Sequence, residues 1–144
     1  RLLMTISNAE WDVMRVVWTQ EKTTSKEILT ILNQKLEWKS STIKTLLKRL
    51  VDKGYLKTEK NGKSFLYSAL VSEEDAIFEQ VDSVFDKFCP TKYQEILTRL
   101  LAKVEMTESN IKELQDLLEA KKKTAVQEVS CTCIPGQCHC KEHL

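Results

Sequence analysis

The pattern of apolar and polar positions predicts short helices at the start of the chain. Residues 7–10 and 24–27 each form a capping box, in which a hydroxyl residue is followed three positions later by glutamate. After each box, apolar residues recur every three or four positions, which is the period of one helix face. We expect the first helix to reach about Trp18 and the second to end near Leu36.

A third apolar stripe predicts a helix that Ser40 or Ser41 caps and that Gly54 ends. The face opposite this stripe consists of hydroxyl side chains and cations. Its residues are Ser41, Thr42, Lys44, Thr45, Lys48 and Arg49. Hydroxyls and a guanidinium can bond to base edges or phosphates, so this face is a candidate DNA-binding surface. The alternative is an ordinary solvated helix face.

Beyond this helix the period changes from helical to alternating, which is typical of strands. Two alternating runs are joined by Asn61-Gly62, a strong hairpin signal because both residues tolerate the positive φ of a tight turn. With these two residues as the loop, Lys60 and Lys63 face each other at the tip, and Leu56 pairs with Tyr67 at the root. The sequence therefore predicts a hairpin with an apolar root and a basic tip.

The next part of the chain carries amphipathic helices that need a partner. Ser72 caps the first, Cys89-Pro90 interrupts it, and a second apolar stripe follows. Thr107 caps the last helix, which we expect to run towards Val129. Helices of this kind cannot bury their stripes alone, and the simplest partner is the same element of a second subunit. The sequence therefore predicts a homodimer.

Three helices followed by a hairpin are the layout of the winged helix-turn-helix, whose third helix enters the major groove while the hairpin, or wing, touches the flanking backbone. We therefore expect a mainly α fold with one small β-hairpin. It comprises a winged-helix DNA-binding domain over residues 1–71, a helical dimerisation domain over 72–129, and a cysteine-rich metal-binding tail over 130–144.

The distribution of charge supports a nucleic-acid partner, although the net charge is only +1. The first 70 residues hold 13 Lys/Arg against 7 Asp/Glu, whereas residues 71–130 hold 8 against 13. A basic half beside an acidic helical half favours a DNA-binding domain joined to an assembly domain. We expect Lys60 and Lys63 to contact phosphates and to make binding salt-dependent. The alternative is that these lysines only keep the turn soluble.

Two Cys-x-Cys pairs near the C-terminus give the strongest chemical signal. Cys131 and Cys133 form one pair, Cys138 and Cys140 form the other, and a Pro-Gly dipeptide between them favours a turn that brings the pairs together. Four thiolates so placed can hold zinc tetrahedrally or cuprous ions at low coordination. A disulfide cluster is the alternative, but cytoplasmic thiols are kept reduced. The sequence therefore predicts a metal site.

The remaining candidates for chemistry are weak. His139 and His143 are interpreted as bystanders, because four thiolates already complete a zinc site. Cys89 stands alone before a proline and is expected to be buried as a small apolar side chain. We expect no enzymatic activity, since no nucleophile and base, phosphate loop or close carboxylate pair stands out. No signal peptide or apolar stretch of roughly 18 residues is present, so we expect a cytoplasmic protein with no membrane partner.

With these motifs in view, the chain resembles the CopY-type copper-responsive repressors, relatives of the penicillinase and methicillin-resistance repressors. The resemblance covers nearly the whole chain. Its carriers are residues 6–11 with Val13 and Met14, residues 42–50 with Lys53 and Gly54, and the two Cys-x-Cys pairs, which distinguish the copper branch from its antibiotic-resistance relatives.

The resemblance implies a homodimer that represses copper-export genes from a palindromic operator of double-stranded DNA. It implies one Zn(II) per subunit in the DNA-binding form, two Cu(I) per subunit that displace zinc and release the DNA, and a copper chaperone as donor. It also suggests that Ser41, Thr42, Thr45 and Arg49 meet the DNA.

Two other classes of function compete with this interpretation. In a cytosolic copper- and zinc-buffering protein, the tail would store metal and the winged helix would mediate only protein contacts, which leaves the basic third helix unexplained. In a thiol redox enzyme, a catalytic thiolate would need activation, usually by a helix N-terminus, which the tail lacks. Metal-sensitive binding to an operator separates the repressor from both.

Overall fold

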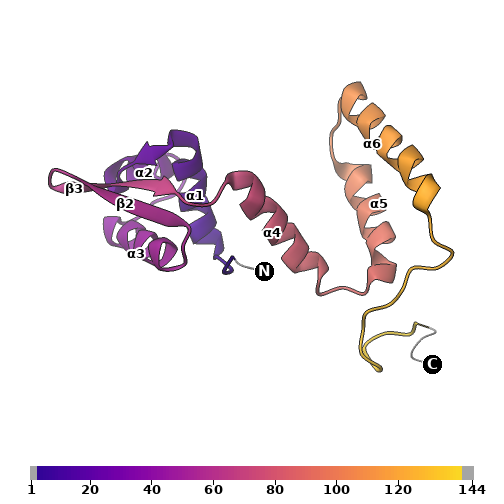
Figure 1. Ribbon diagram of the computed structural model, residues 1–144. Coiled ribbons are helices and arrows are strands. Elements are labelled where there is room, and N and C mark those ends of the chain that lie inside the picture. Colours follow the sequence, from indigo (N-terminus) through magenta and orange to yellow (C-terminus); the bar gives the residue numbers. More distant parts are fainter. Residues whose placement is uncertain (1–2, 141–144) are drawn as a thin grey trace. The chain divides into compact units, whose positions relative to one another are not determined.

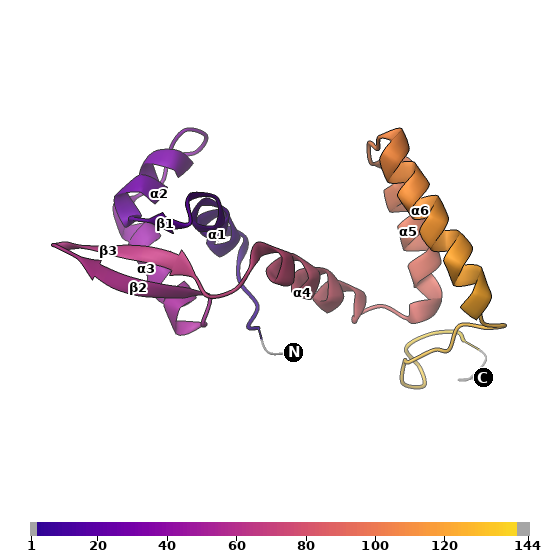
Figure 2. The ribbon, with the colours of Figure 1, turned by 45° about the horizontal axis from the view of Figure 1, so that its top comes forward.

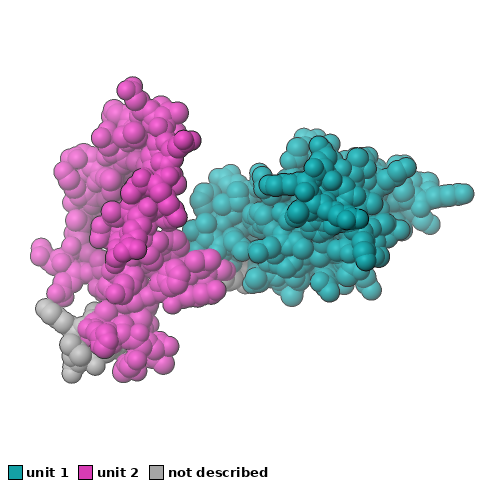
Figure 3. All heavy atoms as spheres, turned by 180° about the vertical axis from the view of Figure 1, so that it is seen from behind, with its two compact units in different colours: residues 1–82 teal, residues 83–144 magenta. Residues whose placement is uncertain are grey.

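The computed structural model describes residues 3–140 (Figure 1). Within them the chain forms two compact units, which divide between residues 82 and 83 (Figure 3). This division falls inside helix α4 (Glu73–Phe85), so the helix belongs in sequence to both units.

Ahead of α4, the first unit consists of three helices and a three-stranded antiparallel sheet (Figures 1 and 2). Its helices are α1 (Asn8–Gln20), α2 (Ser25–Leu32) and α3 (Ser40–Asp52), and its strands are β1 (Lys22–Thr23), β2 (Leu56–Asn61) and β3 (Ser64–Ala69). The strand order is β1-β3-β2. Three helices followed by a β-hairpin are the winged helix-turn-helix arrangement that the sequence predicts.

The core of this unit forms where the apolar stripes of the helices meet the root of the hairpin. Its buried members include Val13, Met14 and Val17 of α1, Ile28 of α2, Ile43, Leu46, Leu47 and Leu50 of α3, and Tyr55 and Leu56 at the root. Because the apolar stripe of α3 is turned into this core, the opposite face of α3 is left at the surface.

The predicted caps of the first two helices are confirmed. The Ser7 hydroxyl accepts from the Glu10 amide at 3.1 Å, and the Glu10 carboxylate accepts from the Ser7 amide at 3.0 Å. At α2 the Thr24 hydroxyl accepts from the Glu27 amide, but the Glu27 carboxylate accepts from the hydroxyl of Thr23. Both helix starts therefore follow from short local patterns.

The prediction that the second helix ends near Leu36 is wrong, because α2 ends at Leu32. Asn33 follows as the C-cap, and its side-chain oxygen accepts from the backbone amide of Trp38 at 2.6 Å. This bond holds the chain in a turn that leads away from the helix. Leu36 lies in that turn and is 62% exposed.

Helix α3 begins at Ser40 but is not capped by a serine. Its N-cap is Lys39, which makes no side-chain capping bond. Ser40 is already helical, and the Thr45 hydroxyl donates to the carbonyl of Ser41 within the helix. At the other end, Gly54 takes a φ of +81° just beyond the helix, as the predicted glycine stop requires.

The hairpin is present, but its loop is shifted by one residue. β2 continues through Asn61, which pairs with Ser64, so the loop is Gly62-Lys63 rather than Asn61-Gly62. Gly62 has a φ of +65°, and the only described residue other than glycine with a positive φ is Glu21. Glycine in the first loop position with an ordinary residue in the second is the type II′ pattern, not a turn with positive φ at both loop residues as expected from Asn61-Gly62.

The shifted register changes the cross-strand partners. Lys60 pairs with Phe65 rather than facing Lys63, and Leu56 pairs with Ala69 rather than Tyr67. The two corrections leave the character of the hairpin as predicted, because the root is still apolar and both lysines remain close to the tip.

Strand β1 was not predicted. Its two residues pair with the centre of the sheet, Lys22 with Ser68 and Thr23 with Tyr67. A segment of two residues shows no alternation that a sequence pattern could reveal. Thr23 is nevertheless fully buried, and β1 pairs with the side of β3 that faces away from β2.

The second unit continues from α4 through the 3₁₀ turn η1 (Pro90–Lys92), α5 (Tyr93–Lys103), α6 (Glu108–Lys121), the 3₁₀ turn η2 (Lys122–Thr124) and the tail. The predicted caps Ser72 and Thr107 accept from the amides of Asp75 and Asn110. Helix α6 ends well before the predicted Val129. The segment that follows it contains threonine and valines, which are weaker helix formers.

Helices α5 and α6 leave their apolar stripes largely open to solvent in the single chain. Leu97, Leu100, Leu101 and Val104 of α5 and its exit, and Ile111, Leu117 and Leu118 of α6, are all exposed. Exposed apolar surface on this scale usually marks an interaction surface. Among residues 3–140, no helix has both the length and the apolar character that crossing a bilayer demands.

Candidate DNA-binding surface and metal centre

The outer face of α3 presents the six helix residues that were predicted to face DNA. Ser41, Thr42, Lys44, Thr45, Lys48 and Arg49 are all exposed. The hydroxyl proton of Thr45 is used by the carbonyl of Ser41, 2.9 Å away, so its oxygen is left chiefly as an acceptor. The face thus combines acceptors with cationic donors, which suits contact with base edges and phosphates.

The cations of this face are not paired with acidic side chains of the described chain. Within residues 3–140, Lys44, Lys48 and Arg49 form no ion pair. The same holds for the exposed wing residues Lys60 and Lys63. Unpaired cations on a helix face and a neighbouring hairpin are available for phosphate oxygens.

The wing is fixed to α1 by a contact beyond the sheet. The indole of Trp18 donates to the carbonyl of Val71, 2.9 Å away, just after β3 ends. Trp18 in turn packs edge-on against Trp11, with ring centroids 5.3 Å apart. The two tryptophans, which pack against the core, therefore help to hold the hairpin in place.

The tail forms the turn that the Pro-Gly dipeptide predicts. Gly136 has a φ of +98°, and the amide of Gln137 donates to the carbonyl of Ile134 at 3.1 Å. The side chain of Gln137 also accepts from the amide of Ile134 at 3.2 Å. This turn reverses the chain, so the second Cys-x-Cys pair returns towards the first.

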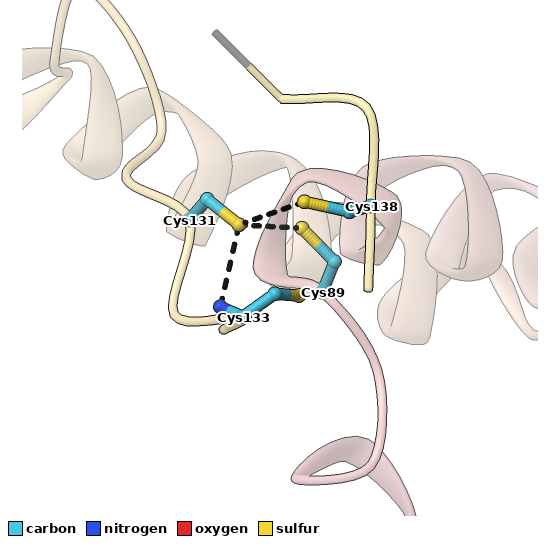
Figure 4. Close-up of side chains that lie close together, drawn as sticks. All are labelled: Cys89, Cys131, Cys133 and Cys138. Carbon is cyan, nitrogen blue, oxygen red and sulfur yellow. Dashed lines mark hydrogen bonds between the residues drawn. The ribbon is translucent and has the colours of Figure 1, made fainter. Parts of the chain in front are cut away.

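Four sulfurs converge in the second unit, and one of them comes from outside the tail (Figure 4). The Sγ atoms of Cys89, Cys131, Cys133 and Cys138 all lie within 4.8 Å of one another. Cys131 Sγ is 3.5 Å from Cys89 Sγ and 3.3 Å from Cys138 Sγ. The expectation that Cys89 stands alone is therefore wrong, although its side chain is buried as predicted.

Cys140 lies beside this group rather than within it. Its sulfur is 3.6 Å from Cys89 Sγ and 3.7 Å from the Thr91 hydroxyl. His139 is exposed and is not a member of the sulfur group, and His143 lies outside the described residues. Three of the four predicted ligands thus share one site with Cys89, and the fourth adjoins it.

Cys89 is held in place by the turn that joins α4 to α5. The Tyr93 hydroxyl donates to the carbonyl of Phe85 at 2.9 Å, and the two rings pack edge-on with centroids 5.1 Å apart. The amide of Lys92 donates to the carbonyl of Cys89 itself. Contacts from α4, η1 and α5 therefore hold the backbone at Cys89.

The environment of Cys89 favours its thiolate. Hydrogen bonding to the side chain and backbone of Thr91, whose hydroxyl is 3.0 Å from the sulfur, lowers the Cys89 pKa to about 6. Thiolates are the form that binds metals. Lys87 and Lys92 line the same hollow as Cys89, where their charge would offset that of a metal bound by several thiolates.

The sulfur group fits a thiophilic metal ion. Four ligands at the usual Zn–S distance of about 2.3 Å form a tetrahedron whose edges are about 3.8 Å. The closest sulfur pairs in the group, at 3.3 and 3.5 Å, are near that edge. None of the five cysteines, all of which lie in the described part of the chain, forms a disulfide. A lone fifth cysteine beside four clustered ones is a signal that could have raised Cys89 as a candidate ligand.

A family model supplies the context for both sites. The model described as penicillinase repressor matches residues 6–120. The chain belongs to the penicillinase repressor family. The match includes the whole winged helix and Cys89 but stops before the tail cysteines, so the family alone does not account for the two Cys-x-Cys pairs.

Individual relatives agree with this assignment. An uncharacterized 16.5 kDa protein from the ptsI 3′ region of Latilactobacillus sakei is 41% identical over 137 residues, covering 95% of this chain and 94% of the relative. The penicillinase repressor of Bacillus licheniformis is 31% identical over 117 residues, covering 81% and 91%. The solved structure of the CopR repressor is 46% identical over 48% of this chain and 100% of its own, with a TM-score of 0.41. The Bacillus licheniformis relative is itself named a repressor.

Proposed function

We propose that this member of the penicillinase repressor family is a copper-responsive transcriptional repressor. In this proposal a dimer with zinc in its thiolate site binds a palindromic operator, and Cu(I) displaces the zinc and releases the DNA. The observation that carries the proposal is the convergence of cysteine sulfurs in the second unit of a chain whose family is one of repressors.

In the DNA-bound state, α3 enters the major groove. Arg49 and the hydroxyls of Thr42 and Thr45 read base edges, and Lys44 and Lys48 contact phosphates. Lys60 and Lys63 contact the backbone beside the groove and contribute affinity without sequence information. The exposure of all these side chains, and the absence of ion pairs at the cations within residues 3–140, support this division of roles.

The dimer forms through the helices that follow the wing. The exposed apolar stripes of α5 and α6 supply the surface, and a second copy of the chain supplies the complementary one. We propose that residues 1–71 act as the DNA-binding domain, 72–129 as the dimerisation domain and 130–144 as the metal-sensing tail.

The copper signal is geometric rather than electrostatic. One Zn²⁺ with four thiolates carries a charge of −2, and two Cu⁺ with four thiolates carry the same −2. Net charge therefore does not distinguish the two states, whereas the coordination does, because zinc favours a tetrahedron and cuprous ions accept lower coordination. The path of the tail between its cysteines must change when the metals exchange.

The proposal is tested by fluorescence anisotropy of a labelled palindromic operator. Zinc-loaded protein is titrated onto the DNA, and Cu(I) is then added without oxygen. We expect release when two Cu(I) per subunit have bound, and no copper-dependent release for the variant with Cys131, Cys133, Cys138 and Cys140 changed to Ser. Binding that ignores copper contradicts the sensor. Failure to bind DNA in either metal state favours a metal-buffering protein that uses the same thiolates.

A further inference from the structure

We propose that Cys89 is a ligand of the zinc-bound form and that Cys140 takes its place when copper enters. Zinc would then link the tail to the turn between α4 and α5 through shared coordination, and copper binding would remove this link. This inference rests on the proposed function, because it assigns the ligand exchange through which the same site would signal.

The sulfur positions separate Cys89 from Cys140. Cys89 belongs to the group whose sulfurs all lie within 4.8 Å of one another, together with Cys131, Cys133 and Cys138. Cys140 Sγ approaches Cys89 Sγ to 3.6 Å but is not a member of that group. A tetrahedral ion needs four mutually close sulfurs, so the quartet that includes Cys89 is the one suited to zinc.

Cys89 differs from the other ligands in the structure of the backbone that carries it. The tail cysteines lie on a segment without regular secondary structure, whereas Cys89 directly precedes η1 and its carbonyl accepts from Lys92. The tyrosine contact between Tyr93 and Phe85 braces the same turn. Cys89 is held by these contacts, whereas the other three ligands lie on the irregular tail. We therefore expect the tail, rather than the turn, to adapt to the metal.

Cys140 lies close enough to Cys89 to replace it as a metal ligand. It adjoins Cys89 and completes the second Cys-x-Cys pair with Cys138. Two Cu⁺ held by the four tail thiolates would leave Cys89 without a metal. The exchange balances, because the Cys140 thiol releases its proton to solvent as it becomes a ligand, Zn²⁺ leaves as two Cu⁺ enter, and no oxidation state changes.

The consequence lies at the end of α4. Cys89 follows that helix by a few residues, and α4 itself begins directly after the winged helix in sequence. In the zinc form the tail is bonded to this turn through the metal. In the copper form the four tail thiolates bind only one another's metals, so the tail is detached from the helical part of the chain.

The test is the alkylation of the full-length wild-type protein by iodoacetamide, with each modified cysteine located by mass spectrometry. We expect Cys89 to be protected and Cys140 modified in the zinc form, and the reverse after two Cu(I) per subunit have bound. Zinc removal by a chelator should abolish the protection of Cys89, which separates coordination from simple burial. Equal modification of Cys89 with and without zinc, or protection of Cys140 in the zinc form, overturns the inference.

Matched variants extend the test. Cobalt(II) replaces zinc as a spectroscopic probe, and thiolate-to-cobalt charge-transfer absorption reports how many thiolates bind. We expect Cys140→Ser to keep the wild-type intensity and the double variant Cys89→Ser/Cys140→Ser to lose about a quarter of it, since one of four ligands is gone. A loss of that size in Cys140→Ser alone contradicts the inference. Copper-driven operator release by the wild type, measured separately, still supports the proposed function in that case.

Discussion

Lys53 Nζ lies 2.9 Å from Glu10 Oε1, which joins the residue after α3 to the first turn of α1. Lys53 also donates to the carbonyl of Thr5 at 3.1 Å. Glu10 is only 2% exposed. Burial on its own would raise the pKa of Glu10, but the hydrogen bonds from Lys53 and Ser7 outweigh it and hold the pKa below the ordinary 4.5. The start of α1 thus fixes the end of the proposed recognition helix.

Replacing Lys53 by Met should therefore destabilise the first unit. A buried carboxylate would lose its cationic partner, at a cost of about 1–3 kcal/mol in the free energy of unfolding. Urea denaturation at neutral pH measures this cost. Lys48→Met removes an exposed lysine without an ion pair in the described chain and should change stability by less than about 0.5 kcal/mol. Equal effects of the two variants would contradict the role of the pair.

The same pair predicts how stability depends on pH. The pKa of Glu10 is lower in the folded than in the unfolded protein, so its contribution is present above pH 4.5 and is lost as the pH falls through the folded value. Urea denaturation of the wild type below pH 4.5 should show this loss. In Glu10→Gln the titrating group is absent, and the decline should be shallower. Identical pH profiles would show that other carboxyl groups cause the loss of stability at low pH.

The sequence patterns predicted elements that depend on near neighbours. The capping box of Ser7 and Glu10 and the apolar stripe of α3 each lie within a few turns of chain, and both appear in the fold. The hairpin was predicted for a similar reason, but its register was not, because Asn61 and Gly62 are both good turn residues and the choice between neighbouring loops depends on the whole ladder.

Features that depend on distant contacts were missed. Strand β1 exists because Thr23 meets Tyr67 of β3 across the fold. Cys89 joins the sulfur group because the tail returns to it from 42 residues further along the chain. Neither contact leaves a local periodic signal. In both cases the physical cause is tertiary packing, which residue spacing alone does not encode.

The proposed roles of α3 and the wing predict different effects on DNA binding. Arg49→Ala should weaken operator binding by about 1–3 kcal/mol and relax the preference for one base pair. Lys63→Ala should weaken binding to all sequences alike and reduce the slope of log K against log salt by about 0.9 for each subunit, or about 1.8 for the dimer. Anisotropy with operator and unrelated duplexes at several salt concentrations separates them. Lys103→Ala, in α5, is the charge-matched control and should leave both quantities unchanged.

The exposed stripe of α6 predicts where the dimer can be broken. Leu117 and Leu118 are 56% and 58% exposed in the single chain, and a carboxylate placed in a dimer interface would be buried without a partner. Leu117→Glu should shift the mass measured by sedimentation from dimer towards monomer and weaken operator binding. Leu36→Glu alters a leucine of similar exposure outside the proposed dimerisation helices and should leave the mass unchanged. An unaltered dimer in Leu117→Glu would exclude this surface.

Thr91 provides a test of the chemistry at Cys89. Its hydrogen bonds are the largest of the interactions that lower the Cys89 pKa to about 6 from the ordinary 9.0, and the sulfurs of Cys131 and Cys140 add smaller contributions. Thr91→Val removes the hydroxyl but keeps the backbone, so the pKa should rise part of the way back. In metal-free protein the pH at which Cys89 becomes alkylated by iodoacetamide should move upwards. Thr98→Val, whose hydroxyl bonds to Gln94 within α5, should have no effect.

The rise in pKa also has a consequence for zinc. A protonated thiol must lose its proton before it binds the metal, so proton competition at Cys89 should extend to higher pH in Thr91→Val. If Cys89 is a zinc ligand, zinc affinity of this variant should fall more steeply than that of the wild type as the pH is lowered from 9 towards 6. Competition with a chromophoric chelator across this range measures it. A shifted alkylation profile with unchanged zinc affinity would mean that Cys89 ionises as described but does not bind zinc.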